Sequence, residues 1–158
     1  MVTALKQMNG DPVQYMPPGP DATDQELVDW ANALPLARQL HIVCVALNHS
    51  EATFRVAETL LPPNPNGAIH GGVVSAIADQ CLGVVSVINA PRDLMSVTAS
   101  LHGQYHRPAM PPLIFRSRLI SAGRRLIFVE VEVEDALGRR CATFQATMVV
   151  GGAERRAK

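Results

Sequence analysis

The sequence predicts an α+β fold, in which one long buried helix packs on an antiparallel sheet of five to six strands. Residues 71–89 are apolar on nearly every side, a pattern typical of a helix that is buried all round. From residue 95 to residue 150, apolar and polar residues alternate, and the connections between the alternating segments are short. Short connections join antiparallel neighbours, so this part of the chain is expected to form most of the sheet.

The chain is 158 residues long, which is the size of one domain with a full core. We expect a main domain over residues 36–150, an N-terminal arm with a short helix over residues 1–35, and a frayed tail over residues 151–158. In the arm, Thr23 and Glu26 have the spacing of a capping box, and apolar residues follow at helical spacing until Pro35. The short helix is therefore expected to start after Thr23 and to end before Pro35.

Six segments of the main domain have the alternating or apolar character of strands. The first two are expected to form a hairpin, because Asn48 begins a three-residue turn signal between them. A proline-rich loop at residues 60–67 precedes the long helix, and the other four strands follow it. The six strands are expected at residues 41–47, 51–58, 95–105, 113–120, 126–134 and 141–150.

Composition and charge exclude several functions. The chain has 14 basic and 14 acidic residues, so it lacks the net positive charge that nucleic-acid binding usually requires. Aromatic residues make up only 4% of the chain, too few for a base-stacking surface. Cys44, Cys81 and Cys141 are odd in number and lie in apolar segments, which predicts buried free thiols in a reducing compartment. No signal peptide is visible in residues 1–10, and we expect a cytoplasmic protein.

Asp79 is the only charged residue between residues 59 and 91, and it falls in the middle of the apolar helix. In a membrane-spanning helix this carboxylate would cost about 2.5–3.5 kcal/mol, so a membrane span is disfavoured. In a protein core, a lone carboxylate incurs a desolvation cost or has a functional role. A solvated helix stripe shared with Gln80, or a hydrogen bond to a backbone group in the core, explains Asp79 equally well. The residue pattern leaves these readings open.

The start of the helix is a second candidate for chemistry, since it combines carboxamides, an imidazole and glycines. The residues concerned are Asn64, His70, Gly71 and Gly72. Free backbone N–H groups at a helix N-terminus favour negative charge, so they could bind a developing oxyanion. An ordinary loop-to-helix junction, with His70 as a structural cap, is the alternative.

Other chemistries find no support in the sequence. It contains no phosphate-binding loop, no dinucleotide-binding glycine motif and no nucleophile elbow. His102 and His106 lie on one face of the same predicted strand, but at about 3.3 Å per residue they are roughly 13 Å apart. Two ligands at this separation cannot share a metal ion. The sequence therefore predicts neither a metal site nor a bound cofactor.

Taken together, the motifs of the region from about residue 41 to residue 150 resemble the hotdog-fold acyl-CoA thioesterases of the PaaI-like, phenylacetate-pathway type. The resemblance implies a sheet wrapped around a long helix, a homodimer that often pairs into a tetramer, and hydrolysis of acyl-CoA thioesters. It rests on the spacing Asn64-x-x-Gly67-x-x-His70-Gly71-Gly72, on Asp79 nine residues after His70, and on Val97-Thr98 and Tyr105-His106-Arg107-Pro108-Ala109.

The resemblance also implies a role for each matching residue. Gly71 would offer its backbone N–H to the thioester carbonyl, and Asn64 and His70 would shape and support that pocket. Asp79 would be the general base for water, or the nucleophile. Thr98 matches a position that helps to orient the water or the carboxylate. The strand alternation, however, predicts that Thr98 lies on the polar face of its strand, away from the helix.

Further residues are expected to contact the substrate. Gly72 lets a ligand approach the main chain without a Cβ in the way. Arg107, Arg124 and Arg125 could bind the phosphates of coenzyme A, since guanidinium groups pair well with phosphate. Ordinary solvated charges at turns are the alternative interpretation of these arginines.

Helix geometry predicts that the proposed site needs two subunits. Asp79 lies eight residues beyond Gly71, which is about 12 Å along a helix axis. A base must be within hydrogen-bond reach of the proton that it removes. If both residues act on one thioester, Asp79 must therefore come from a second copy of the chain.

Two other functions fit the same motifs. One is a non-catalytic module that binds or senses acyl-CoA without releasing thiol. The other is a hotdog hydratase that acts on an enoyl thioester, since that reaction also uses a histidine and a carboxylate.

Overall fold

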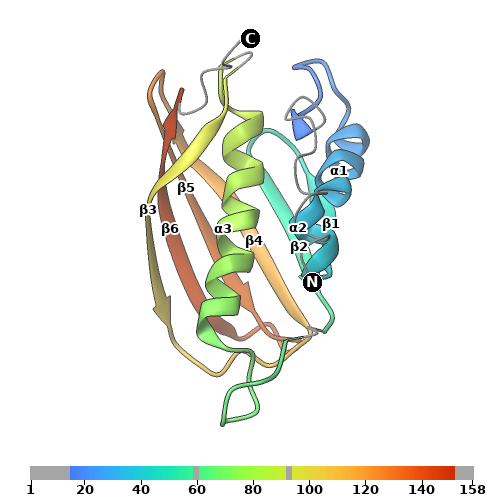
Figure 1. The fold of residues 1–158 in the computed structure, drawn as a ribbon, viewed down its shortest axis with the longest axis vertical. Helices are drawn as coiled ribbons and strands as arrows, with labels where there is room; N and C mark the ends of the chain where they lie inside the picture. Colours follow the sequence, from blue (N-terminus) through green and yellow to red (C-terminus); the bar gives the residue numbers. More distant parts are fainter. Residues whose placement is uncertain (1–14, 59–60, 92–93, 152–158) are drawn as a thin grey trace, which may run out of the picture.

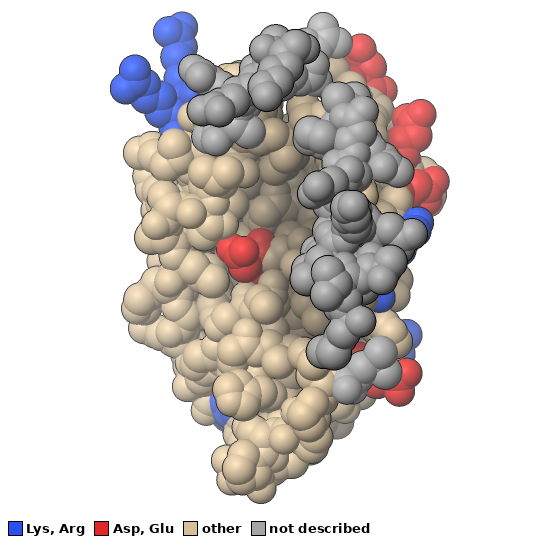
Figure 2. All heavy atoms as spheres, viewed as in Figure 1, with Lys and Arg blue, Asp and Glu red and all other residues tan. Residues whose placement is uncertain are grey.

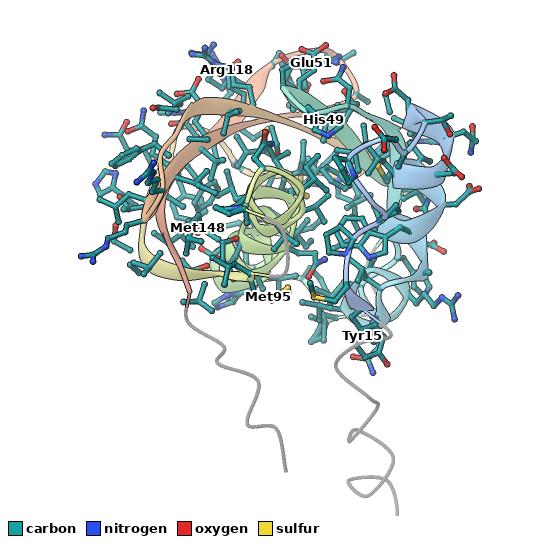
Figure 3. All side chains as sticks on the ribbon, turned by 90° about the horizontal axis from the view of Figure 1, so that it is seen from above. Tyr15, His49, Glu51, Met95, Arg118 and Met148 are labelled. Atoms are coloured by element: carbon teal, nitrogen blue, oxygen red, sulfur yellow. The ribbon has the colours of Figure 1, made fainter. Side chains whose placement is uncertain are left out.

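The computed structural model describes residues 15–58, 61–91 and 94–151. In these residues a single antiparallel sheet of six strands curls around the long helix α3 (Gly71–Ile88), as Figures 1 and 3 show. The predicted fold class is thereby confirmed. The strands are β1 (Ile42–Leu47), β2 (Glu51–Val56), β3 (Ser96–Tyr105), β4 (Leu113–Ala122), β5 (Leu126–Glu134) and β6 (Arg140–Val150).

The order of strands across the sheet is β1-β2-β4-β5-β6-β3, and every neighbouring pair is antiparallel. β3 directly follows α3 in the chain but lies at one edge of the sheet, where it pairs only with β6. Seen from above in Figure 3, Met148 lies between the sheet and α3, whereas Glu51 and Arg118 lie on the outer face. The inner face thus forms the core, and β3 leaves one edge of the sheet unpaired in the single chain.

The N-terminal helix forms as predicted. α1 (Asp24–Ala33) begins after Thr23, whose hydroxyl accepts a hydrogen bond from the Glu26 N–H, while the Glu26 carboxylate accepts one from the Thr23 N–H. Pro35 ends α1 but also starts a second short helix, α2 (Pro35–Gln39), because proline suits the first position of a helix. α1 packs against β1, where the Asn32 side chain bonds both backbone groups of Cys44.

The three cysteines are buried and unpaired, as predicted. Cys44 lies on β1, Cys81 on α3 and Cys141 on β6, all in the core between sheet and helices. Burial raises the pKa of Cys44 to about 11 and raises that of Cys81 well above the ordinary thiol value. Because a raised pKa keeps these thiols protonated, Cys44 and Cys81 pack in the core and are unreactive.

The predicted orientation of Thr98 is wrong, and the cause is a β-bulge. Thr98 pairs with Met148, whose side chain faces the core, so Thr98 also faces α3. The pairing register shifts between Thr98 and Ser100, and beyond this shift the odd-numbered residues Leu101 and Tyr105 face the helix side. One inserted residue moves every later side chain to the opposite face. Simple alternation along β3 therefore holds only after the bulge.

α3 is less buried than its sequence suggests. By length and hydropathy it could cross a membrane, but it contacts strands β2 to β6 and is the core helix of the sheet. Only 44% of its residues are buried, however. An outward stripe remains open along the helix, consisting of Gly72, Ala76, Asp79, Gln80 and Gly83. We refer to these five residues as the outward stripe of α3.

Candidate active site

Asp79 lies halfway along α3, where the outward stripe meets β3. Its side chain is half-buried, and its Oδ1 accepts a hydrogen bond of 2.8 Å from the Thr98 hydroxyl. Among the described residues, Oδ2 has no hydrogen-bond partner. α3 and β3 contain no other charged residue, and Figure 2 shows a single acidic group in an otherwise uncharged area on this face. The single chain thus presents one oriented carboxylate with a free oxygen at its surface.

The N-terminus of α3 leaves one backbone donor free. His70 is the N-cap, and its Nδ1 accepts a hydrogen bond of 3.1 Å from the Gly72 N–H. This is the capping role that the sequence left open, and it requires the proton of a neutral ring to be on Nε2. In contrast, the Gly71 N–H has no acceptor among the described residues. A donor at the positive end of the helix dipole is therefore available to a bound oxygen atom.

Asn64 shapes the loop that leads into this helix start. Its side-chain Oδ1 accepts hydrogen bonds from the backbone N–H groups of Asn66, at 2.9 Å, and Ala68, at 3.1 Å. The loop is joined to the segment after β3 by a hydrogen bond from the Ile69 N–H to the Ala109 carbonyl. Asn64 therefore fixes the path of the chain towards His70.

Tyr105 belongs to this region, although no role was predicted for it. Its hydroxyl lies 2.6 Å from the Gly71 carbonyl oxygen and 2.6 Å from the Ser75 hydroxyl. A Cβ added to Gly71 would lie 3.4 Å from the Tyr105 ring, which is an ordinary contact. The glycine is therefore not required by packing inside the single chain. The alternation of β3 places Tyr105 on the helix side, but nothing in the pattern indicates a contact with a backbone carbonyl.

The structure forms two separate groups from the predicted residues. Thr98 and Asp79 are in contact, and His70, Gly71 and Gly72 lie together at the helix start. Asp79 is eight residues from Gly71 on the same helix, a rise of about 12 Å, so one chain does not bring the carboxylate to the free N–H.

The arginines predicted to contact the substrate lie at opposite ends of the folded molecule. Arg107 follows β3, where it lines an open cleft with His106, Arg139 and Arg140, and its backbone N–H bonds the Cys141 carbonyl. Arg124 and Arg125 form the turn between β4 and β5, and the Arg125 carbonyl accepts from the N–H of Val150, at the far end of β6. Cys141 and Val150 are nine residues apart on one strand, about 30 Å. These arginines cannot bind the same phosphate group within one chain.

No group of three or more histidine, cysteine, aspartate or glutamate side chains within residues 15–58, 61–91 and 94–151 could hold a metal ion. The groups of the candidate site are those of acid–base chemistry: the carboxylate of Asp79, the hydroxyl donor of Thr98 and the free backbone N–H of Gly71. This set can activate a water molecule and bind a developing negative charge.

Comparison with known proteins agrees with this geometry. The model of the thioesterase superfamily matches residues 66–142, which include the helix start, Asp79 and Thr98. A Thermoplasma acidophilum protein that carries the provisional name of an esterase is 28% identical over 83 residues. The aligned part is 52% of this chain and 62% of that relative, less than two thirds of its length.

Two solved structures have a similar fold. The Escherichia coli PaaI protein from the phenylacetic acid degradation operon has a TM-score of 0.69 and 17% identity, covering 77% of this chain and 88% of its own. A Streptococcus mutans protein bound to acetyl-CoA has a TM-score of 0.64 and 23% identity, covering 72% of this chain and 91% of its own. From the sheet that curls around α3 and the match across the candidate site, we conclude that this chain has the hotdog fold and that its residues 66–142 are similar to the thioesterase superfamily.

Proposed function

We propose that this protein is an acyl-CoA thioesterase that hydrolyses its substrate by direct attack of water. Asp79 removes a proton from water, the oxygen of that water bonds to the thioester carbon, and the carbonyl oxygen becomes an oxyanion. The Gly71 N–H donates to this oxyanion. The carbon–sulfur bond then breaks, and coenzyme A leaves as the thiol once its sulfur is protonated. Attack by Asp79 itself, through an anhydride that water opens, uses the same two groups.

The observation that supports this proposal is the pair of unused hydrogen-bonding groups on α3. The Gly71 N–H has no acceptor and Asp79 Oδ2 has no donor among the described residues, and α3 and β3 contain no charged residue other than Asp79. Thr98 donates a hydrogen bond to the other carboxylate oxygen, Oδ1, and so fixes the carboxylate while leaving Oδ2 without a partner. The thioesterase superfamily and the acetyl-CoA complex of the similar Streptococcus mutans structure support acyl-CoA as the substrate class.

The mechanism requires a homodimer, because Asp79 of one chain must reach Gly71 of another. The outward stripe of α3 contains small residues such as Gly72, Ala76 and Gly83, which allow a second helix to approach closely. β3 is a ten-residue edge strand without a charged residue, and Val97 on it is 44% exposed. Edge strands of stable monomers usually carry charges or prolines that block pairing. These features favour a second copy of the chain as the partner. Pairing of two such dimers into a tetramer is compatible with the mechanism.

The same dimer would give the arginines a common location. If Asp79 of each chain faces Gly71 of the other, the two α3 helices run antiparallel. Arg107 lies at the end of the molecule where α3 begins, and Arg124 and Arg125 lie at the opposite end. An antiparallel pair therefore brings Arg107 of one chain and the two turn arginines of the other to the same end of the dimer. Coenzyme A carries phosphates at two positions that such a group could bind.

Release of free thiol from a panel of acyl-CoAs tests the proposal. The wild type should turn over at least one member, and Asp79→Asn should lower the rate by about 10² to 10⁴, the usual contribution of a general base. Glu51→Gln is the matched control, since Glu51 is an exposed carboxylate on the outer face of the sheet.

Equal rates for wild type and Asp79→Asn would refute the assignment of Asp79. Saturable binding of acyl-CoA without thiol release would indicate a binding module instead. Loss of the enoyl absorbance without thiol release would indicate a hydratase.

A further inference from the structure

Tyr105, the last residue of β3, is hydrogen-bonded to the first turn of α3. The Tyr105 hydroxyl lies 2.6 Å from both the Gly71 carbonyl oxygen and the Ser75 hydroxyl. A tyrosine hydroxyl has one hydrogen to donate, and the Gly71 carbonyl can only accept. Tyr105 therefore donates to Gly71 and accepts from Ser75. The hydroxyl oxygen of Tyr105 thus connects the end of β3 to the Gly71 carbonyl and to the Ser75 hydroxyl of α3.

This contact is not needed to satisfy the helix. In a regular α-helix the carbonyl of residue 71 already accepts the N–H of residue 75, so Tyr105 uses the second lone pair of that oxygen. Tyr105 is 50% exposed, so its hydroxyl could bond water at no desolvation cost. Instead the hydroxyl of Tyr105 holds the first turn of α3, in which the Gly71 N–H is free to bind an oxyanion. What the contact fixes is the position of the Gly71 amide relative to β3.

The ring of Tyr105 is itself held in place. It packs edge-on against Phe144, with ring centroids 5.5 Å apart and planes at 90°. Phe144 is buried and lies under β3 at Gly103, where an added Cβ would be 2.3 Å from the Phe144 ring. The missing side chain of Gly103 thus allows the Phe144 ring to reach the Tyr105 ring. A fixed ring makes the hydroxyl a rigid support rather than a mobile surface group.

We propose that Tyr105 is a positioning residue that holds the Gly71 amide where the oxyanion forms. The inference rests on the proposed function and extends it to a residue outside the predicted site. Through its hydroxyl, Tyr105 fixes the first turn of α3 from the strand side, while His70 caps the neighbouring Gly72 N–H from the loop side. Tyr105 and His70 thus hold the Gly71 amide from two sides, and neither of them accepts a hydrogen bond from the Gly71 N–H.

Tyr105→Phe tests the role, because it keeps the ring and removes only the hydroxyl. We expect kcat to fall about tenfold, part of the 10² to 10³ that a whole oxyanion donor contributes. The KM for acyl-CoA should change by no more than about twofold, since a displaced donor affects the transition state more than the bound substrate. Ser75→Ala should retain most of kcat, because the bond from Tyr105 to Gly71 remains.

Ser96→Ala is the matched control. Ser96 also joins β3 to α3 through its hydroxyl, which lies 2.7 Å from the Ser86 hydroxyl at the other end of the strand. It should leave kcat unchanged. An unchanged kcat in Tyr105→Phe, or an equal loss in Ser96→Ala, would overturn the positioning role.

A second readout does not depend on activity. Amide hydrogen exchange at Ser75, whose N–H bonds the Gly71 carbonyl in a regular helix, should be about fivefold faster in Tyr105→Phe, the ratio expected for one lost hydrogen bond. Unchanged exchange would overturn the role even if the enzyme is active. A wild type that releases no thiol would instead refute the proposed function, and the exchange result would still decide whether Tyr105 holds the helix start.

Discussion

Replacing Gly71 with proline would remove one backbone N–H from the proposed site and change little else. Gly71 is the first residue of α3, a position at which proline is favoured because its φ angle is already helical. The residue before a proline must be extended, and His70 has φ −59° and ψ 135°. The substitution is thus compatible with the backbone as it stands.

The structure sets the size of the expected effect. The Gly71 N–H has no acceptor among the described residues, so its removal breaks no hydrogen bond of the free chain. We therefore expect the free energy of unfolding to change by less than about 0.5 kcal/mol, as for most substitutions away from special contacts. In contrast, kcat should fall by about 10² to 10³, the effect of removing one oxyanion donor.

Gly71→Ala is the control, because it adds a methyl group but keeps the N–H. Its Cβ would lie 3.4 Å from the Tyr105 ring, on the side of β3 and at an ordinary contact distance. Thiol release under saturating acyl-CoA should therefore fall far less in Gly71→Ala than in Gly71→Pro. If the two variants lose kcat equally while both remain folded by circular dichroism, the N–H of residue 71 is not the oxyanion donor.

The same variant tests whether two chains share each site. When Gly71→Pro and Asp79→Asn chains are co-expressed in equal amounts, random pairing makes half of the dimers mixed, and each mixed dimer has one site with both groups intact. Activity should then return to about a quarter of the wild type, although each variant alone should retain no more than about 1%. If both groups acted within one chain, every site would lack one of them and no activity would return.

Three further predictions concern the dimer, the packing of β3 and the pH dependence of stability. Ala76→Glu should give a folded monomer without thioesterase activity, measured by light scattering and thiol release, because Ala76 is exposed on the outward stripe; an active dimer would contradict it. Gly103→Ala should lower the free energy of unfolding by about 1–3 kcal/mol in denaturant titrations, because its Cβ would overlap the buried Phe144 ring; no loss would show that the ring can move aside. Arg139 holds the pKa of Asp135 below its ordinary 3.8, so this pair stabilises the fold above that pH and the contribution is lost as the pH falls through the lowered value. Asp135→Asn should therefore lower the Tm more at about pH 7 than at about pH 2.5, and an equal loss at both would exclude a role for the charge.

The fold followed from the sequence because its main signals are local. The apolar run of α3, the capping box of Thr23 and the alternation of the strands each depend on residues within a few positions of one another. The bulge after Thr98 could not be predicted, since β3 pairs with β6, about fifty residues later in the chain, and the alternation alone does not show an inserted residue. Pairing with a distant strand thus decided which way a predicted site residue faces.

The candidate site was predicted less completely than the fold. Spacing and resemblance indicated Asp79 and the helix start, and the structure connects Asp79 with Thr98 in spite of the alternation. Tyr105 was missed because its hydroxyl bonds a backbone carbonyl 34 residues earlier in the chain, and a backbone acceptor leaves no trace in the sequence. The capping role of His70 became visible only in the hydrogen bond that its Nδ1 accepts from the Gly72 N–H.

The proposed homodimer would relate these features by a two-fold axis. In a symmetric dimer, contact of residue 71 with residue 79 of the second chain implies the reverse contact, so the axis passes near the residue midway between them. That residue is Ser75, and its neighbour on the outward stripe is Ala76, both small enough for two helices to cross there. The part of β3 alongside this stretch runs from Thr98, which contacts Asp79, to Tyr105, which contacts Gly71 and Ser75. Its centre is close to the middle of the unpaired strand, so the axis that brings Asp79 to Gly71 could also pair β3 with a second β3. A single axis would then complete the sheet and both active sites, and in that dimer the separation of Asp79 and Gly71 along one helix would be the spacing that two antiparallel helices need.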